Sequence, residues 1–238
     1  SGRTSSQNSV LIRGLSRTRR TNGLAPANDV MTSRGELYLL LAEPFRFPSP
    51  AQVEQFISGL WGQRVSAIAK VLNCDHDYHL PLADVPTLDV SEDSHQVEFI
   101  SLYEVGMGGA PCPLHSGHYS KDRMRTLEEV VRFYQFFDFV ADRSPDRFQD
   151  HITFELAFMA HLADLQWQAV AQGEDGESPL RAQRDFVARH LGSWLPQLSG
   201  LVAQKSQVRF FSQSTDLLKA YVAADQLYLD ATVQPVHQ

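Results

Sequence analysis

The sequence has very few cysteines and no long apolar run. Its 238 residues include two cysteines, Cys74 and Cys112, which lie far apart and match no zinc-binding or redox spacing. We therefore expect two reduced thiols rather than a disulfide framework, as is usual for a cytosolic protein. No apolar stretch approaches the roughly 20 residues that a membrane-spanning helix needs, so we expect no membrane span.

The motifs of several enzyme classes are also missing. The chain has no Gly-x-Ser-x-Gly motif for a nucleophilic serine and no phosphate-binding P-loop. The glycines Gly106, Gly108 and Gly109 follow an expected helix rather than a strand, which is typical of a turn and not of a dinucleotide-binding fingerprint. The sequence therefore favours a binding protein over an enzyme.

Acidic residues are absent from the first part of the chain. Residues 1–28 carry five arginines and no acid, whereas the whole chain has a net charge of −7, so the remainder carries about −12. An acidic body argues against binding of nucleic acid, which needs patches of lysine and arginine. It would suit a basic peptide, although solubility alone is the simpler interpretation.

The composition of residues 1–28, rich in Ser, Thr, Arg, Asn and Gly, predicts a flexible N-terminal tail. Arg19 and Arg20 form a twin-arginine pair, but a secretion signal would continue with an apolar stretch, and Thr21-Asn22-Gly23 follows instead. We expect residues 29–238 to form one domain, because no convincing boundary or internal repeat interrupts them.

Strand-like alternation is absent, and helical spacing of apolar residues is widespread. The fold class we predict is all-α, a single globular bundle of about seven to eight helices. The expected helices cover residues 30–42, 50–72, 91–104, 122–140, 145–168, 179–191, a short helix ending near 205, and 208–229, with a bend at 192–196. Residues 73–90 and 106–119 are expected to be loops, and the second is unusually apolar for a loop in solvent.

The stretch 145–168 predicts one long buried helix, beginning at Pro145 and Asp146. Two neighbouring apolar stripes cover more than half of its circumference. They comprise Phe148, Ile152, Leu156, Met159, Ala163 and Val170, and Phe154, Phe158, Leu162 and Leu165. His151 and Glu155 lie inside this arc, four residues apart, and Asp150 lies at its edge, so these polar groups need partners.

A metal site is one interpretation of these polar residues. His151 and Glu155 have the spacing of two ligands on one helix turn, and Cys112, His115 and His118 lie close together in the sequence. Zinc needs three or four such ligands with specific spacing, and a His–Glu pair is more often a structural contact. An all-α metal-dependent enzyme would need the two regions to converge; we expect no metal or other cofactor.

Three stretches in residues 34–170 together carry a family pattern. They read Tyr38-x-x-Leu41-Ala42-x-x-Phe45-x-x-Pro48; Glu98-Phe99-x-x-Leu102-Tyr103 with Pro111-x-Pro113-Leu114-x-Ser116-x-x-Tyr119; and Pro145-Asp146 with Asp150-His151-Ile152-x-x-Glu155-Leu156-x-Phe158-Met159. In this order the stretches resemble the TorD/DmsD/NarJ-type chaperones, the redox-enzyme maturation proteins. The family often places Pro-Asp directly before the histidine, whereas Arg147-Phe148-Gln149 intervene here.

The resemblance implies an all-helical, TorD-like fold and a cytoplasmic, system-specific chaperone that is not an enzyme. Members bind the apo catalytic subunit of a molybdenum oxidoreductase, often at its twin-arginine leader peptide, assist cofactor insertion and delay export. Some relatives swap domains across a linker like 73–90, so a monomer or a domain-swapped dimer is expected. The resemblance and the apolar loop together indicate a peptide-binding site of Asp150, His151, Glu155, Pro111, Pro113, Ser116, Tyr119 and Tyr103.

Two alternatives stay open at this point. Asp150 and His151 could cap the central helix and form a buried pair with Glu155 without touching a partner. The protein could also be a structural helical subunit of a larger complex, which would show a large exposed apolar face.

Overall fold

A computed structural model of the chain describes residues 26–76, 78–81, 85–104, 109–140 and 148–233. In these ranges there are nine α-helices and no β-strand, which confirms the predicted all-α class. The helices are α1 (Pro26–Leu41), α2 (Pro50–Ile57), α3 (Leu60–His76), α4 (Glu92–Tyr103), α5 (Arg123–Phe136), α6 (Ile152–Ala171), α7 (Glu177–Phe186), α8 (Gly192–Lys205) and α9 (Arg209–Thr232). None of these helices has the length and hydropathy that a membrane span requires.

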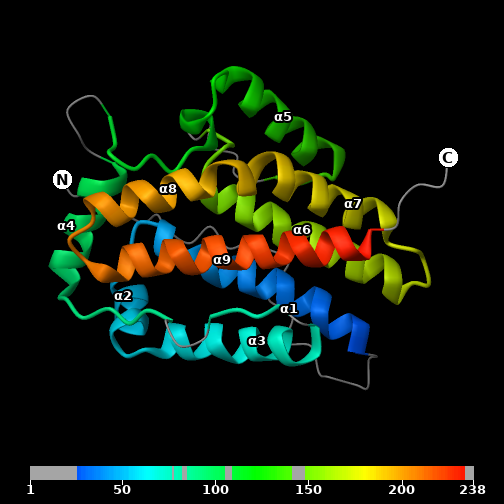
Figure 1. The fold of residues 1–238 in the computed structure, drawn as a ribbon, viewed down its shortest axis with the longest axis horizontal. Coiled ribbons are helices and arrows are strands. Elements are labelled where there is room, and N and C mark those ends of the chain that lie inside the picture. Colours follow the sequence, from blue (N-terminus) through cyan, green and yellow to red (C-terminus); the bar gives the residue numbers. More distant parts are fainter. Residues whose placement is uncertain (1–25, 77, 82–84, 105–108, 141–147, 234–238) are drawn as a thin grey trace, which may run out of the picture.

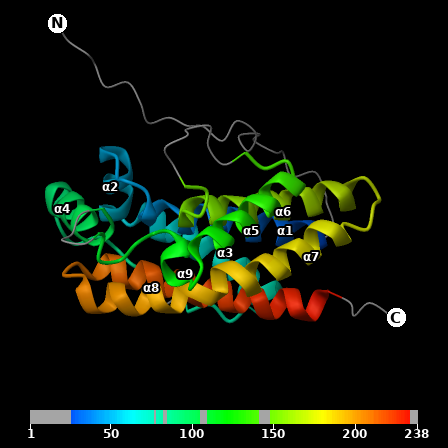
Figure 2. The same ribbon diagram turned by 90° about the horizontal axis from the view of Figure 1, so that it is seen from above.

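The bundle is built around α1 and α6. Helix α1 packs on α6 and α3, α7 packs on α6, and α8 packs on α9. Gly35 lies at the contact of α1 with α6, where a Cβ would be in ordinary van der Waals contact with the carbonyl oxygen of Ala160, at 3.5 Å. In both views α2 and α4 lie at one end, and the turn between α6 and α7 lies at the other (Figure 1, Figure 2).

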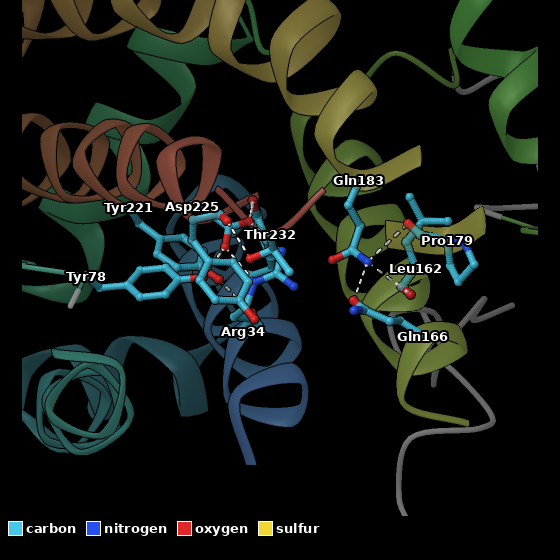
Figure 3. A network of polar contacts seen from close by, with 11 residues as sticks. Arg34, Tyr78, Leu162, Gln166, Pro179, Gln183, Tyr221, Asp225 and Thr232 are labelled. Atoms are coloured by element: carbon cyan, nitrogen blue, oxygen red, sulfur yellow. Dashed lines mark hydrogen bonds and ion pairs between the residues drawn. The ribbon is translucent and has the colours of Figure 1, made fainter. Parts of the chain in front are cut away.

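A buried ionic network ties α1 to α9. The guanidinium of Arg34 donates to Asp225 through Nε (2.6 Å) and Nη2 (2.9 Å), and neither side chain is exposed. The hydroxyls of Tyr38 and Tyr78 donate to the same carboxylate at 2.7 and 2.5 Å. Figure 3 shows Arg34, Tyr78 and Asp225 converging between α1 and α9. Because Tyr78 follows α3, the network also anchors the segment that leads away from that helix.

A second polar contact joins α6 to α7. The amide of Gln183 in α7 donates to Gln166 Oε1 in α6 at 2.9 Å, and also reaches the carbonyl oxygen of Pro179 at 3.1 Å (Figure 3). Both glutamine side chains are buried, so this bond offsets the cost of placing two amides in the core.

The predicted helix 50–72 is wrong in one respect, because it is two helices. Helix α2 ends at Ile57 and α3 begins at Leu60. Gly59 between them has φ +74°, a left-handed conformation that glycine adopts without strain. Ile57 and Leu60, on either side of this break, are 43% and 48% exposed.

The predicted bend at 192–196 is also wrong. A π turn at Val187–Leu191 joins α7 directly to α8, and Pro196 lies inside α8. A Cβ on Gly192 would lie 3.0 Å from the carbonyl oxygen of Val187, so glycine permits this tight junction. The chain therefore changes helix type here instead of leaving the helix. The other helix predictions differ at their ends: α3 runs on to His76, and α5 stops at Phe136.

The central helix α6 is buried as predicted but begins later, at Ile152 rather than at Pro145. Residues 145–147 lie outside the described part of the chain. Phe148, expected in the apolar stripe, precedes the helix and is 52% exposed. Of the predicted N-terminal tail, residues 1–25 lie outside the described part of the chain, and residues 26–28 belong to α1.

Candidate functional site

The apolar loop after α4 is docked onto the start of α6. The amide of Ser116 donates to the carbonyl oxygen of Asp150 (3.0 Å), and the amide of Ile152 donates to that of Leu114 (2.8 Å). The pair forms an isolated antiparallel bridge between His115 and His151. At its other end, the loop is fixed by the amide of Cys112, which donates to the carbonyl oxygen of Leu102 in α4 at 2.8 Å. We call the described residues 109–119 the docked loop.

Asp150 is the polar anchor of the docked loop. It is 1% exposed. His115 Nδ1 donates to its Oδ1 (3.0 Å), and the amide of Gly117 donates to its Oδ2 (3.0 Å). Burial by itself raises the pKa of the Asp150 carboxyl, but the hydrogen bonds from His115 and Gly117 and the charge of His115 outweigh it and hold the pKa below its usual value. Asp150 is therefore an ionised carboxylate that holds the loop.

Gly117 has no room for a side chain. A Cβ there would lie 2.6 Å from Cγ of Arg123 and 2.8 Å from Oδ2 of Asp150. The amide of Gly117 can approach the carboxylate only because the residue is glycine. The contact between Gly117 and Asp150 thus depends on both residue types.

His151 is the N-cap of α6, not part of its buried face. Its Nδ1 accepts a hydrogen bond from the amide of Thr153 at 3.3 Å and lies 2.8 Å from the Thr153 hydroxyl. The imidazole is half-buried, and its ring centroid is 4.9 Å from that of His115. Phe148 packs edge-on against His115, and Arg123 lies over the Phe148 ring at 5.0 Å. The accessible groups at this place are therefore imidazoles, an aromatic ring and a guanidinium.

Glu155 lies underneath the docked loop and has no exposed surface. The indole Nε1 of Trp194 in α8 donates to Glu155 Oε2 at 3.1 Å. The other oxygen, Oε1, has no hydrogen-bond partner within the described residues, and neither has the buried hydroxyl of Ser116. Burial raises the pKa of Glu155 to about 8, against the opposing effects of Ser116 and Trp194 and with a smaller contribution from the charge of Asp150.

The aromatic residues of the predicted site lie in two different environments. Tyr119 is half-buried, donates from its hydroxyl to the carbonyl oxygen of Pro113 (2.8 Å) and stacks on Trp194 with centroids 5.1 Å apart. Tyr103 is 7% exposed and packs against Phe99 and Phe211. Tyr119 thus holds the loop against Trp194 of α8, whereas Tyr103 belongs to the core.

The structure brings the predicted site residues to one place but exposes only some of them. Pro111 is exposed, and Pro113, Tyr119 and His151 are half-buried. Asp150, Glu155, Ser116 and Tyr103 are buried beneath or beside them.

The metal hypothesis required the docked loop and His151 to converge, and they do. The predicted ligands, however, do not come together. Glu155 faces Trp194, and Cys112 is fully buried against α4. Among the residues that the structure describes, no three His, Cys, Asp or Glu side chains are grouped so that they could hold a metal ion.

The sequence did not single out Trp194, the donor to Glu155, or the pair of Arg34 and Asp225. Each charged residue of that pair lies on an apolar helix face. Arg34 shares a face with Leu37, Tyr38 and Leu41, and Asp225 shares one with Tyr221 and Leu229. A charge within an apolar stripe is a signal that could have marked both residues as buried partners.

A separate groove of about 660 Å³ lies at the C-terminal end of α5, between α5 and α7. It contains none of the predicted site residues. Its apolar part is formed by Phe133, Phe136 and Phe137, and Phe136 is 75% exposed. Its charged part includes Asp175 and Asp185. The exposed apolar residues elsewhere, such as Val97 in α4 and Leu227 in α9, lie on different helices.

The chain shares sequence with several assembly chaperones. It is 36% identical over 110 residues to the selenate reductase assembly chaperone protein of Thauera selenatis and 35% identical over 109 residues to the chlorate reductase assembly chaperone protein of Ideonella dechloratans. Each match covers 45% of this chain and spans little more than half of the relative, 57% and 56%. The perchlorate reductase assembly chaperone protein of Dechloromonas aromatica (strain RCB) is 28% identical over 82% of this chain and 89% of its own length.

The family profile described as nitrate reductase delta subunit matches residues 81–199, which is half of the chain. This range contains α4, the docked loop and α6, so it includes the whole of the site built above. The chain therefore belongs to the nitrate reductase delta subunit family, which includes the TorD/DmsD/NarJ-type chaperones that its sequence resembles.

Proposed function

We propose that this protein is an assembly chaperone for the catalytic subunit of a molybdenum oxidoreductase. The family match carries the proposal, and the three relatives named as assembly chaperones of oxyanion reductases support it. The chaperone acts in the cytoplasm and catalyses no reaction. It binds the apo subunit, in part through its leader peptide, and retains it until the molybdenum cofactor has been inserted.

The docked loop and the start of α6 form the surface that meets the client. Pro111, Pro113, Tyr119 and His151 make the contacts, because these predicted residues reach the surface. The buried members of the predicted set, Asp150, Glu155, Ser116 and Tyr103, hold this surface in shape. An arginine of the leader does not reach Asp150, because its carboxylate is only 1% exposed and lies beneath the docked loop.

Titration calorimetry of the full chain against the leader peptide of a molybdenum enzyme encoded beside it in the genome tests the proposal. His151→Asn is the informative variant. Asparagine is a good N-cap, so α6 keeps its start while the imidazole is lost. We expect roughly a tenfold loss of affinity, since a well-packed side chain at an interface contributes on the order of 1–2 kcal/mol.

His76→Asn is the matched control, because His76 is half-buried at the end of α3 and lies away from the loop. It should bind as the unchanged protein does. The Asp150→Ala/His151→Ala double variant should bind more weakly still if it remains folded. Binding that is unchanged in both His151 variants but lost in Phe136→Ser would move the client site to the groove between α5 and α7. No binding of the leader or of the apo subunit by the unchanged protein would contradict the proposed function itself.

A further inference from the structure

Glu155 and Ser116 leave two buried polar atoms facing the same region below the docked loop. Ser116 is 3% exposed and Glu155 is not exposed. In the described part of the chain, neither Ser116 Oγ nor Glu155 Oε1 has a hydrogen-bond partner. The Ser116 side chain nevertheless lies near enough to Glu155 to favour its ionised form. Two unsatisfied atoms at such a place are costly, so their arrangement calls for a physical reason.

In the ranges that the structure describes, the groups that face Glu155 provide no positive charge. Trp194 of α8 donates one neutral hydrogen bond. The docked loop contributes the hydroxyl of Ser116, and the turn before α6 contributes the negative charge of Asp150. Helix α5 contributes Tyr134, whose hydroxyl donates to the carbonyl oxygen of Gln149 at 3.1 Å. A carboxylate here would be a second buried anion close to Asp150.

We propose that Glu155 is a positioning residue for the docked loop and that it holds the loop as a neutral carboxylic acid. In this form its acid proton is available to Ser116 Oγ, while its other oxygen accepts from Trp194. Loss of the proton leaves a buried anion beside Asp150 that Ser116 and Trp194 compensate only in part, and water reaches this anion when the loop lifts away. The loop is therefore docked when Glu155 is protonated and released when Glu155 ionises. This rests on the proposed function only in assigning the loop to the client surface.

The direction of the pH dependence follows from the pKa of Glu155, which burial raises to about 8. In the undocked loop the carboxyl meets water, and its pKa returns to about 4.3. Because the pKa of Glu155 is raised in the docked state, its contribution to docking is complete below about pH 4.3. That contribution is lost as the pH rises through about 8. Between these limits the population of the open loop should rise about tenfold for each pH unit, because one proton is released on opening.

Hydrogen exchange of the full chain tests this inference, with rates corrected for the intrinsic effect of pH. The amides of Cys112, Ser116 and Gly117 report docking, because each donates a hydrogen bond only in the docked loop. We expect their protection to fall about tenfold per pH unit between roughly pH 6 and 8 and then to level off. Amides in the middle of α9 should not follow this profile.

Glu155→Gln is the decisive variant, since it keeps an acceptor for Trp194 and a donor toward Ser116 but cannot ionise. Its loop should stay protected across the whole range, with no tenfold step. The inference is overturned if the unchanged protein shows no pH profile, if Glu155→Gln shows the same profile, or if its loop is unprotected at every pH. The client is absent from this measurement, so the result is independent of whether the proposed function holds.

Discussion

Among the described residues, two carboxylates, Asp225 and Glu155, have no exposed surface, and their surroundings are opposite. Asp225 accepts four hydrogen bonds, two from Arg34 and one each from Tyr38 and Tyr78. Glu155 accepts one, from a neutral indole. Burying a carboxylate is costly unless a charged partner or several donors compensate it, and of these two only Asp225 has a positive partner.

The difference indicates what each region is for. The Asp225 network joins α1, α9 and the segment after α3. Burial by itself lowers the pKa of Arg34, but the charge of Asp225, the hydrogen bond to it and the nearby tyrosines Tyr78 and Tyr221 together outweigh burial and raise the pKa, so Arg34 stays charged. Such a network has one low-energy arrangement, and its role is to hold these parts of the fold together. Glu155 lies below a loop that is fixed at a few points and has one oxygen without a partner. Perturbed and incompletely satisfied groups cluster at functional sites, and this one lies under the proposed client surface.

The largest loss of stability is expected from removing Arg34. Arg34→Met leaves the Asp225 carboxylate buried without a counter-charge, and breaking a buried pair in this way costs about 3–5 kcal/mol of unfolding free energy. Urea unfolding at neutral pH measures the loss. Arg64→Met is the matched control, because Arg64 pairs with Glu43 at 3.7 Å and is 48% exposed, and it should cost less than about 1 kcal/mol.

Adding Asp225→Leu to Arg34→Met separates the missing counter-charge from lost packing. The double variant contains neither buried charge, so its loss should be smaller than the sum of the two single losses. Additive losses would show that Asp225 does not need Arg34 as its counter-charge, and the contrast with Glu155 would disappear.

Periodicity predicted most of the fold because it depends on residues that are close in sequence. The buried face of α6 and the extent of α4 were predicted correctly, since both are local properties. The start of α6 was misplaced because Pro145 and Asp146 are also good first-turn residues, and the actual N-cap, His151, is an unusual one. Nothing local distinguishes the two choices.

Contacts between distant residues account for the remaining misses. Arg34 and Asp225 are 191 positions apart, and Trp194 lies 39 positions from Glu155. The resemblance identified Asp150 as important, but its partners His115 and Gly117 follow from how the docked loop pairs with residues 150–152. Whether a polar side chain faces solvent or the interior depends on such pairing. The sequence therefore could not separate the exposed from the buried members of the site.

A smaller effect is expected from Gly117→Ala. The added methyl group would meet Asp150 Oδ2 at 2.8 Å and Arg123 Cγ at 2.6 Å, so the carboxylate must move away from the amide that it accepts from. Overpacking of this kind costs about 1–3 kcal/mol. Gly200→Ala is the control, because the structure describes no atom within 4 Å of its Cβ position in α8, and alanine there should be neutral or stabilising. Urea unfolding of both variants checks the prediction, and equal stabilities would mean that Gly117 is not a tight contact.

The smallest effect is expected from removing one tyrosine hydroxyl in each of the two regions. Tyr119→Phe removes the hydroxyl that donates to Pro113 and keeps the ring that stacks on Trp194, so a neutral bond at a half-buried position is lost. Such a bond contributes about 0.5–1.5 kcal/mol, whereas Tyr38→Phe removes a fully buried donor to a carboxylate, which contributes about 1.5–3 kcal/mol. Urea unfolding of the two variants at one pH gives both values. If Tyr119→Phe cost as much as Tyr38→Phe, the docked loop would be as firmly held as the core, and a loop that one proton releases would not be compatible with that result.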